Sequence, residues 1–216
     1  MNFASKASLA EYLGTDVGSS ELVIEDSPDL TALPPLPWSY TYMRVANCGG
    51  IKRLPKLPKS LRFLRADNCA RLACLPRLPD TVHDLLVRNC PQISQLPRLS
   101  SELYSLLLSG CPKVTSLPAL PDSLGHLIVD FCSGLATLPR LPDSLTYFRV
   151  KSCSTLEKLP RLPGWLKHIV IEDCPRLTYL PHLPSSLQTV CIHNCPQITT
   201  LDIGGLTIST AASGAY

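Results

Sequence analysis

The sequence predicts a repeat solenoid, in which short parallel strands line one face and extended, proline-rich segments return along the other. Three observations lead to this prediction. The unit LPxLP, once LPRLS, recurs every 21 residues from Leu33 to Leu180 without insertion or deletion. A cysteine occupies one fixed position of the repeat eight times, and hydrophobic residues alternate with polar ones just before it. Each repeat is too short to add a helix of useful length, so we expect little helix.

Composition limits the classes of protein to which the chain can belong. It has 216 residues, of which 45% are hydrophobic and 17% are charged, as in a packed domain. A net charge of +3 is too small to indicate a nucleic-acid or membrane partner. No apolar run approaches the ~18 residues of a membrane span, and the first residues lack the apolar stretch of a secretory signal. We therefore expect protein partners, no nucleic acid, no membrane span and a monomer.

We expect the chain to be organised in three parts. These are an N-terminal segment (1–19) with a short capping helix, a solenoid (20–201) made of a half coil (20–32) and eight coils of 21 residues (33–200), and a C-terminal strand and tail (202–216). In the first part, Ser8 and Glu11 have the spacing of a capping box, and Gly14 is a natural helix stop. The helix is expected to cover the open end of the core.

The return of each coil is predicted from its prolines. We number each coil from its first leucine, so that Leu33 and Leu54 are both position 1. A residue before proline is driven into an extended conformation, and a polyproline helix has three residues per turn. The leucines at positions 1 and 4 therefore face the core, and positions 3 and 6 face solvent. Position 3 is basic in five coils: Lys56, Arg77, Arg98, Arg140 and Arg161. We interpret this column as a solvated face. The alternative is a binding site for phosphates or anionic lipid.

The strand of each coil is predicted where the hydrophobic period changes. Positions 11 and 13 are apolar and alternate with polar residues, as in Phe148 and Val150 or Ile169 and Ile171. This is the pattern of a half-buried strand. One coil cannot bury its leucines alone, so we expect neighbouring coils to stack with parallel strands ~4.8 Å apart.

The repeated cysteine occupies position 16, where the chain leaves the strand. The eight residues are Cys48, Cys69, Cys90, Cys111, Cys132, Cys153, Cys174 and Cys195. A thiol is small and donates weakly, so it suits a buried turn. Disulfides are one alternative, and a metal held by Cys191, His193 and Cys195 is another. We expect reduced, buried thiols in a reducing compartment, and no metal site.

These residues carry a resemblance to a known family. The pattern LxxLxVxxC-P-x-[LIV]-T resembles cysteine-containing leucine-rich repeats, and TxLPxLPxSL resembles the short bacterial repeats of the YopM and IpaH kind of type III secreted effector. The resemblance implies a leucine-rich repeat horseshoe with its parallel sheet on the concave face. It also implies a protein-interaction scaffold that binds host proteins, found in the bacterial cytoplasm and translocated into the host cytoplasm.

The chain offers no evident catalytic centre. IpaH-type effectors are ubiquitin ligases with a CxD motif in a helical domain after the repeats, and no cysteine here is followed two places on by Asp. No phosphate-binding glycine loop or Ser/His/Asp set stands out, and the five histidines sit singly at surface positions. We expect a non-enzyme without a cofactor. The alternative is the substrate-recognition half of a ubiquitin ligase system that lacks its own catalytic domain.

The candidate binding site lies on the open face of the predicted sheet. Position 12 points outward between two buried positions, and position 10 lies beside it. The candidate residues are Tyr42, Arg44, Phe63, Arg65, Leu86, Leu107, Ile128, Tyr147 and Arg149. An apolar centre with an aromatic and arginine rim has the composition of a protein-binding hot spot. The alternative is that leucine and β-branched residues merely suit a strand.

Overall fold

The computed structural model describes residues 5–15 and 18–198. In this part of the chain one helix precedes nine strands of five residues each. The elements are α1 (Lys6–Thr15), β1 (Glu21–Glu25), β2 (Tyr42–Ala46), β3 (Phe63–Asp67), β4 (Asp84–Arg88), β5 (Ser105–Ser109), β6 (His126–Asp130), β7 (Tyr147–Lys151), β8 (His168–Glu172) and β9 (Thr189–His193).

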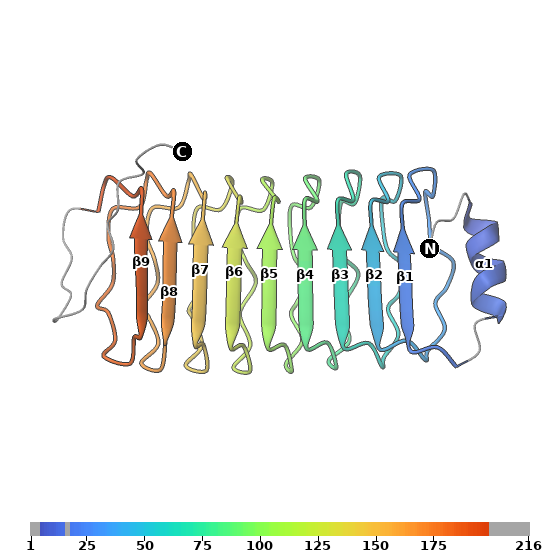
Figure 1. Cartoon of the computed structure of the whole chain (residues 1–216), viewed down its shortest axis with the longest axis horizontal. Coiled ribbons are helices and arrows are strands. Elements are labelled where there is room, and N and C mark those ends of the chain that lie inside the picture. The colour runs from blue at the N-terminus through green and yellow to red at the C-terminus, as the bar shows by residue number, and fades with distance from the viewer. Residues whose placement is uncertain (1–4, 16–17, 199–216) are drawn as a thin grey trace.

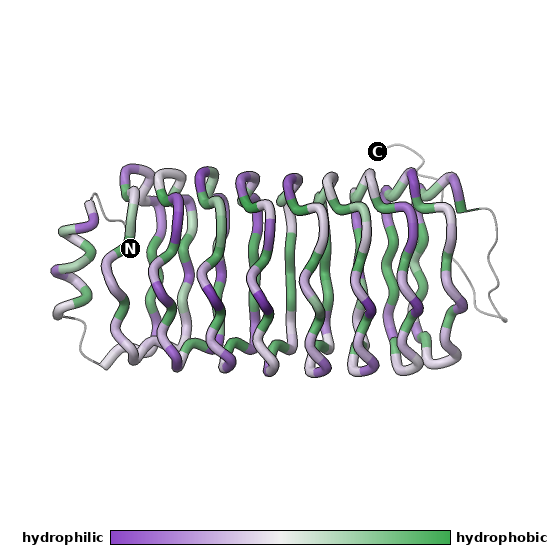
Figure 2. The backbone as a smooth tube through the Cα atoms, turned by 180° about the vertical axis from the view of Figure 1, so that it is seen from behind, coloured by the Kyte–Doolittle hydropathy of each residue, from purple (hydrophilic) through white to green (hydrophobic). Residues whose placement is uncertain are grey.

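The strands form a single parallel sheet in chain order from β1 to β9. Figure 1 shows them side by side, with α1 beside β1 at one end. From behind, the extended returns cross the molecule, and hydrophobic and hydrophilic residues alternate along them (Figure 2). The predicted solenoid, with a sheet on its concave face, extended returns on its convex face and little helix, is confirmed.

The sheet is in strict register, because each strand residue pairs with the residue 21 positions further on. Leu86 pairs with Leu107, and Leu107 pairs with Ile128. The same holds from the first pair of strands to the last. A given repeat position therefore forms a straight row across the sheet, and side chains in one row are neighbours.

The core lies between the sheet and the returns. Every strand buries its second and fourth residues, as the alternation predicts. Most leucines at positions 1 and 4 are buried as well, but Leu36, Leu120 and Leu138 are only partly buried, which the uniform prediction misses. The basic column at position 3 is exposed throughout, as expected for positions that face solvent.

The thiols of the repeated cysteines at position 16 are buried at the turn after each strand. The seven from Cys48 to Cys174 are 0% exposed. Each Sγ lies near the carbonyl oxygen two residues earlier, at 3.2 Å in Cys48 and 3.3 Å in Cys174. The expected buried, weakly donating thiol is confirmed for these seven. Cys195 is only half-buried, contrary to the prediction; it follows β9, the last strand of the described sheet.

The N-terminal helix has a different cap from the one predicted. It begins at Lys6, so Ser8 lies inside its first turn and cannot start a capping box with Glu11. Ser5 is the cap instead, since its Oγ accepts a hydrogen bond from the Ser8 backbone N–H at 3.2 Å. The buried Leu9 and Leu13, four residues apart on one helix face, belong to the same core cluster as β1. The strand and tail expected at 202–216 lie outside the described residues.

Candidate functional site

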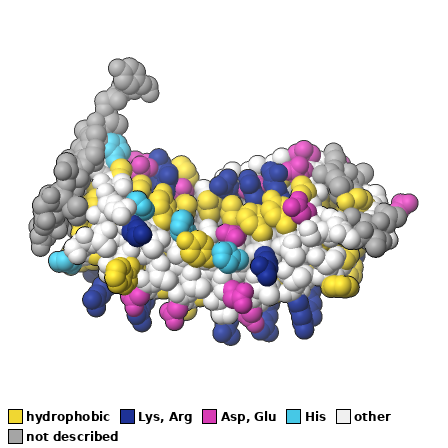
Figure 3. Space-filling view, turned by 60° about the horizontal axis from the view of Figure 1, so that its bottom comes forward, with side chains coloured by type: hydrophobic (Ala, Val, Ile, Leu, Met, Phe, Trp, Pro, Cys, Tyr) yellow, Lys and Arg dark blue, Asp and Glu magenta, His cyan; other side chains and the backbone are white. Residues whose placement is uncertain are grey.

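The sheet face consists of the outward side chains of β1–β9 at positions 10, 12 and 14. All nine predicted site residues lie on it, and all nine are half-buried. Leu86, Leu107 and Ile128 are direct neighbours on β4, β5 and β6, and together they form what we call the apolar strip. Figure 3 shows hydrophobic side chains gathered along this face, with Lys and Arg side chains close by. The residues predicted to lie together are thus placed together.

The arginines at the β1 end of the strip are held by acidic neighbours. Arg65 Nε donates to Asp67 Oδ2, and Arg44 Nε lies 3.6 Å from the same oxygen. Arg44 Nη1 also pairs with Glu25. Asp67 is 5% exposed, so this carboxylate lies beneath the surface and fixes the two guanidinium groups above the sheet.

The cations at the β9 end belong to a balanced network. Arg149 Nε donates to Asp130 Oδ1 at 3.2 Å, and its Nη2 lies 3.8 Å from Glu172. Lys151 Nζ lies 2.9 Å from Glu172. Burial raises the pKa of Asp130, and the Arg149 charge opposes this rise. Arg149 lies beside Ile128 in the sheet register, but the sequence could not show that its guanidinium is already paired.

Aromatic rings stack along the edge where the strands begin. Tyr42 and Phe63, both predicted site residues, stack with ring centroids 4.6 Å apart and an interplanar angle of 7°. A second row continues over five coils with centroid separations from 5.1 to 6.1 Å: His83, Tyr104, His126, Tyr147 and His168. The prediction that the histidines sit singly is therefore wrong for His83, His126 and His168. Figure 3 shows His side chains along this part of the molecule.

A glycine explains why sequence reasoning missed this row. Tyr104 belongs to position 9, whereas His126 belongs to position 10, so the rings share no single column. The Tyr104 ring lies over Gly125, where a Cβ would be 2.4 Å from Tyr104 Cε2. Glycine thus lets a ring from one column reach the next. The combination of a ring at position 9 and glycine at position 9 of the following coil is the signal that could have revealed the row.

A ladder of side-chain amides forms the opposite edge, where the strands end. Asn89 Nδ2 donates to Asn68 Oδ1 at 2.9 Å, and Asn68 Nδ2 donates to Asn47 Oδ1 at 2.8 Å. Asn47 in turn donates to Asp26. All four residues have φ between 51° and 54°, a left-handed conformation that Asn and Asp tolerate. The repeated Asn before Cys in three consecutive coils was the sequence signal for this edge.

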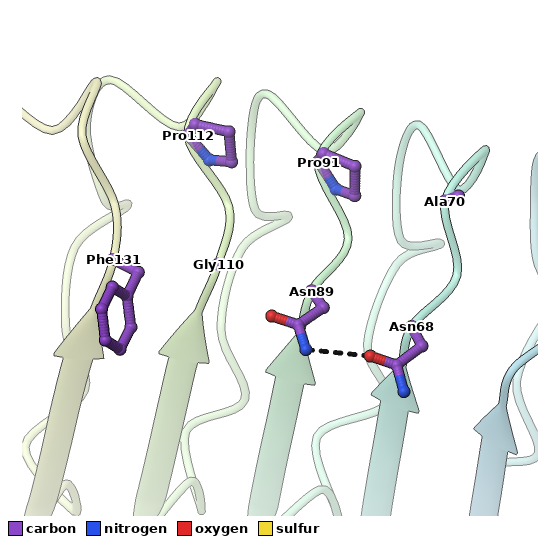
Figure 4. Close-up of a pocket in the computed structure, with 7 residues that line it drawn as sticks. All are labelled: Asn68, Ala70, Asn89, Pro91, Gly110, Pro112 and Phe131. Atoms are coloured by element: carbon purple, nitrogen blue, oxygen red, sulfur yellow. Dashed lines mark hydrogen bonds between the residues drawn. The ribbon is translucent and has the colours of Figure 1, made fainter.

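The amide ladder stops at Gly110 and Phe131. Figure 4 shows the break, where the Asn68–Asn89 hydrogen bond ends and the Phe131 ring stands beside an open hollow. The hollow has a volume of about 520 Å³, and its remaining lining includes Pro91 and Pro112. Phe131 has φ 53° and is 53% exposed. A bulky residue in this conformation is strained, and neither its backbone nor its exposure follows from a helix or strand pattern.

The buried thiols are poor candidates for nucleophiles or metal ligands. Burial raises the pKa of Cys111 and of Cys153 to about 11, so both stay protonated at neutral pH. Within residues 5–15 and 18–198, no group of three His, Cys, Asp or Glu side chains is arranged to hold a metal ion. In the same ranges, no helix has the length and apolar character needed to cross a membrane.

Comparisons with known proteins give a fold likeness. No protein-family model matches the sequence, and no curated protein matches it. The structure of YopM from Yersinia pestis, described as a leucine-rich effector protein, is similar over 88% of this chain and 64% of its own, with 24% identity and a TM-score of 0.53. The chain thus spans less than two thirds of that structure.

Two further solved structures match with lower TM-scores. YopM from Yersinia enterocolitica matches over 88% of this chain and 55% of its own, with 22% identity and a TM-score of 0.36. A leucine-rich repeat protein from Bacteroides ovatus matches over 88% and 71%, with 15% identity and a TM-score of 0.38. The chain is a leucine-rich repeat solenoid. Its fold resembles that of YopM.

Proposed function

We propose that the protein is a non-enzymatic scaffold that binds a protein partner through its sheet face. The observation that carries this proposal is the apolar strip. Leu86, Leu107 and Ile128 are contiguous by register and outward-facing, and polar or charged residues border them at position 14. Scattered apolar residues on a surface are ordinary, but a contiguous row bordered by arginines and aromatic rings has the composition of a binding hot spot.

The proposal extends to an effector role. A bacterial effector that works by scaffolding would need a large, rigid surface and no catalytic centre. The nine-stranded sheet provides such a surface, and the likeness to a protein described as a leucine-rich effector supports the idea. Translocation into a host cell, where the thiols would remain reduced, is part of this proposal.

A matched pair of substitutions in one coil tests the scaffold function. Ile128 lies on the sheet face, and Ala119 is exposed on the return of the same coil. Ile128→Asp and Ala119→Asp introduce the same charge on opposite faces. We expect Ile128→Asp to weaken capture of a partner from cell extract at least about tenfold, as loss of a hot-spot contact does, and Ala119→Asp to leave capture unchanged. Circular dichroism checks that both variants fold.

Arg149→Glu would be a poorer test of the sheet face than Ile128→Asp. The new carboxylate would face Asp130 and Glu172, which now pair with the guanidinium, so repulsion would disturb the strand itself. The Ile128 and Ala119 pair avoids this problem. Loss of capture in Ala119→Asp together with normal capture in Ile128→Asp would place the working surface on the return side and contradict the proposal.

A further inference from the structure

A charged hollow lies beside the apolar strip, where β2, β3 and β4 end. Its volume is about 240 Å³, and three arginines from these neighbouring strands line it: Arg44, Arg65 and Arg88. Arg44 and Arg65 are direct partners in the sheet register, and Arg88 follows on the next strand beside Asp67. The volume corresponds to roughly eight water molecules, which is enough for a carboxylate and the methylene groups that carry it.

The hollow holds more positive than negative charge. Asp67 is the single acidic residue in its lining, against three guanidinium groups. Glu25 pairs with Arg44 from outside the lining, which still leaves three positive charges against two negative ones. Arg88 forms no ion pair with any residue in the ranges 5–15 and 18–198. The hollow therefore carries a net positive charge.

Two buried polar atoms show that the internal contacts do not satisfy this cluster. Arg44 Nε has no hydrogen-bond partner among the described residues, and neither does Asp67 Oδ1. The Asp67 side chain is 8% exposed, so its carboxylate holds Arg44 and Arg65 from below while their side chains remain about one-third exposed. An arrangement of this kind pre-orients guanidinium groups for an incoming acceptor.

The edge of the hollow adds neutral donors. Asn47, Asn68 and Asn89 complete the polar lining, and hydrogen bonds along the amide ladder fix their orientation. The other charged region differs, because the carboxylates of Asp130, Glu172 and Asp173 outnumber the cations of Arg149 and Lys151 there. The surplus of positive charge is thus local to the hollow, where β2, β3 and β4 end.

We infer that this hollow binds carboxylates from an acidic segment of the protein partner, next to apolar residues of the same partner that cover the strip. This inference rests on the proposed scaffold function. Planar guanidinium groups match carboxylates in two-pronged pairs. A carboxylate suits the hollow better than phosphate does, because the Asp67 charge inside it repels a dianion more strongly than a monoanion. The partner segment should accordingly carry acidic residues next to apolar ones, in either order along its chain.

The test uses N-acetyl-triglutamate amide as the probe, with the triglutamine equivalent as its uncharged control. Nuclear magnetic resonance of the full chain follows the arginine Nε–Hε signals during titration. We expect saturable shifts at Arg65 and Arg88 with triglutamate and none with triglutamine. Arg98, exposed on the return, is the internal control and should not shift. Equal shifts at Arg98, or no shift at Arg88, would overturn the inference.

Variants and a phosphate titration sharpen the test. Arg88→Gln should weaken triglutamate binding about tenfold or more, as loss of one charged hydrogen-bond pair does, whereas Arg98→Gln should leave it unchanged. Inorganic phosphate at matched ionic strength should bind more weakly than triglutamate. Tighter binding of phosphate would mean that the hollow is a phosphate site, and the carboxylate assignment would then be wrong.

The result can be separated from the test of the scaffold function. If triglutamate fails to bind while capture of the partner still depends on Ile128, the acidic-segment inference fails and the scaffold proposal stands. If triglutamate binds at Arg88 but Ile128→Asp leaves capture unchanged, the carboxylate site stands and the apolar strip is not the binding surface.

Discussion

At the scale of single residues, the turn after each strand combines two demands. Position 15 must adopt a left-handed backbone, and position 16 must fill a buried corner. Asn meets the first demand and extends the amide ladder, as at Asn68. Cys meets the second, because its thiol is small enough to be fully buried and still donates to a nearby carbonyl. Ser27 plays the same part in the half coil, where its Oγ donates to the backbone carbonyl of Glu25.

A reciprocal swap at position 15 tests this account. Phe131 and Asn68 share the same φ, but only Asn68 gains ladder hydrogen bonds. Phe131→Asn should raise the free energy of unfolding by about 0.5–1.5 kcal/mol, because it removes the strain of an aromatic residue in a left-handed backbone conformation. Asn68→Phe should lower it by about 1–3 kcal/mol, through strain and two lost hydrogen bonds. Urea unfolding measures both values.

Phe131→Leu is the control for this swap. Leucine is no better suited than phenylalanine to a left-handed backbone, so this variant should show no gain in stability. A loss of stability in Phe131→Asn would mean that the half-exposed ring makes contacts that outweigh its backbone strain, and the explanation of position 15 would then be wrong.

At the scale of the element, the unit of the molecule is one coil of 21 residues. The turn of each coil is closed by a backbone hydrogen bond such as Leu61 N–H to the Pro58 carbonyl. Hydroxyl groups then tie neighbouring coils together, as when Ser144 Oγ donates to the Leu124 carbonyl at 2.8 Å. Each coil therefore depends mainly on its two neighbours, as in other solenoids.

Deletion of a whole coil should preserve the fold, whereas deletion of part of a coil should not. Removal of residues 96–116 takes out one full period and keeps every remaining residue in register. We expect it to fold cooperatively, with a urea m-value lower by roughly a tenth, since 21 of 216 residues are lost. Removal of 96–106 shifts the alternation of later residues relative to earlier coils. If the variant that lacks residues 96–106 unfolded cooperatively and with wild-type stability, the coil would not be the structural unit.

At the scale of the whole molecule, the sequence predicted the architecture because repetition multiplies a weak local signal. Alternation such as that of Phe148 and Val150 would be ambiguous in one coil, but eight copies in strict register leave one stacking solution. Features that break the repeat were not predictable in this way. The contact between the tilted rings of Tyr104 and His126 depends on which residues of two neighbouring coils meet. The strain at Phe131 arises because an aromatic residue occupies a position that requires a left-handed backbone.

The candidate site was likewise predictable only where it follows the repeat. The row containing Leu107 followed from position 12 alone, and the register confirms that these residues are neighbours. The pairing of Arg149 with Asp130 and the shared carboxylate of Asp67 join different positions of neighbouring coils. Side-chain reach and burial decide such contacts, and a one-dimensional pattern does not contain them.

The buried thiols predict a loss of stability at alkaline pH. An unfolded cysteine titrates near pH 9, whereas burial raises the pKa of Cys111 to about 11 in the folded chain. The folded state therefore holds more protons than the unfolded state between these values, so the free energy of unfolding falls as pH rises above about 9. The stability that this thiol contributes should be complete below pH 9.

The comparison of wild type with Cys111→Ala isolates this thiol. Both proteins should keep a constant difference in unfolding midpoint up to about pH 8.5, and the wild type should lose more stability than the variant between pH 9 and 11. Tyrosine ionisation affects both proteins alike. Parallel pH curves for the two would show that Cys111 is not held protonated by burial.

The central claim is that the sheet face is the working surface of the solenoid. Site-specific photo-cross-linking tests it most directly, with a photoreactive residue in place of either Leu107 on the sheet face or Ala119 on the return. In extract containing the partner, we predict that Leu107 gives a discrete adduct, that Ile128→Asp abolishes it, and that Ala119 gives none. A discrete adduct from Ala119 without one from Leu107 would contradict the claim.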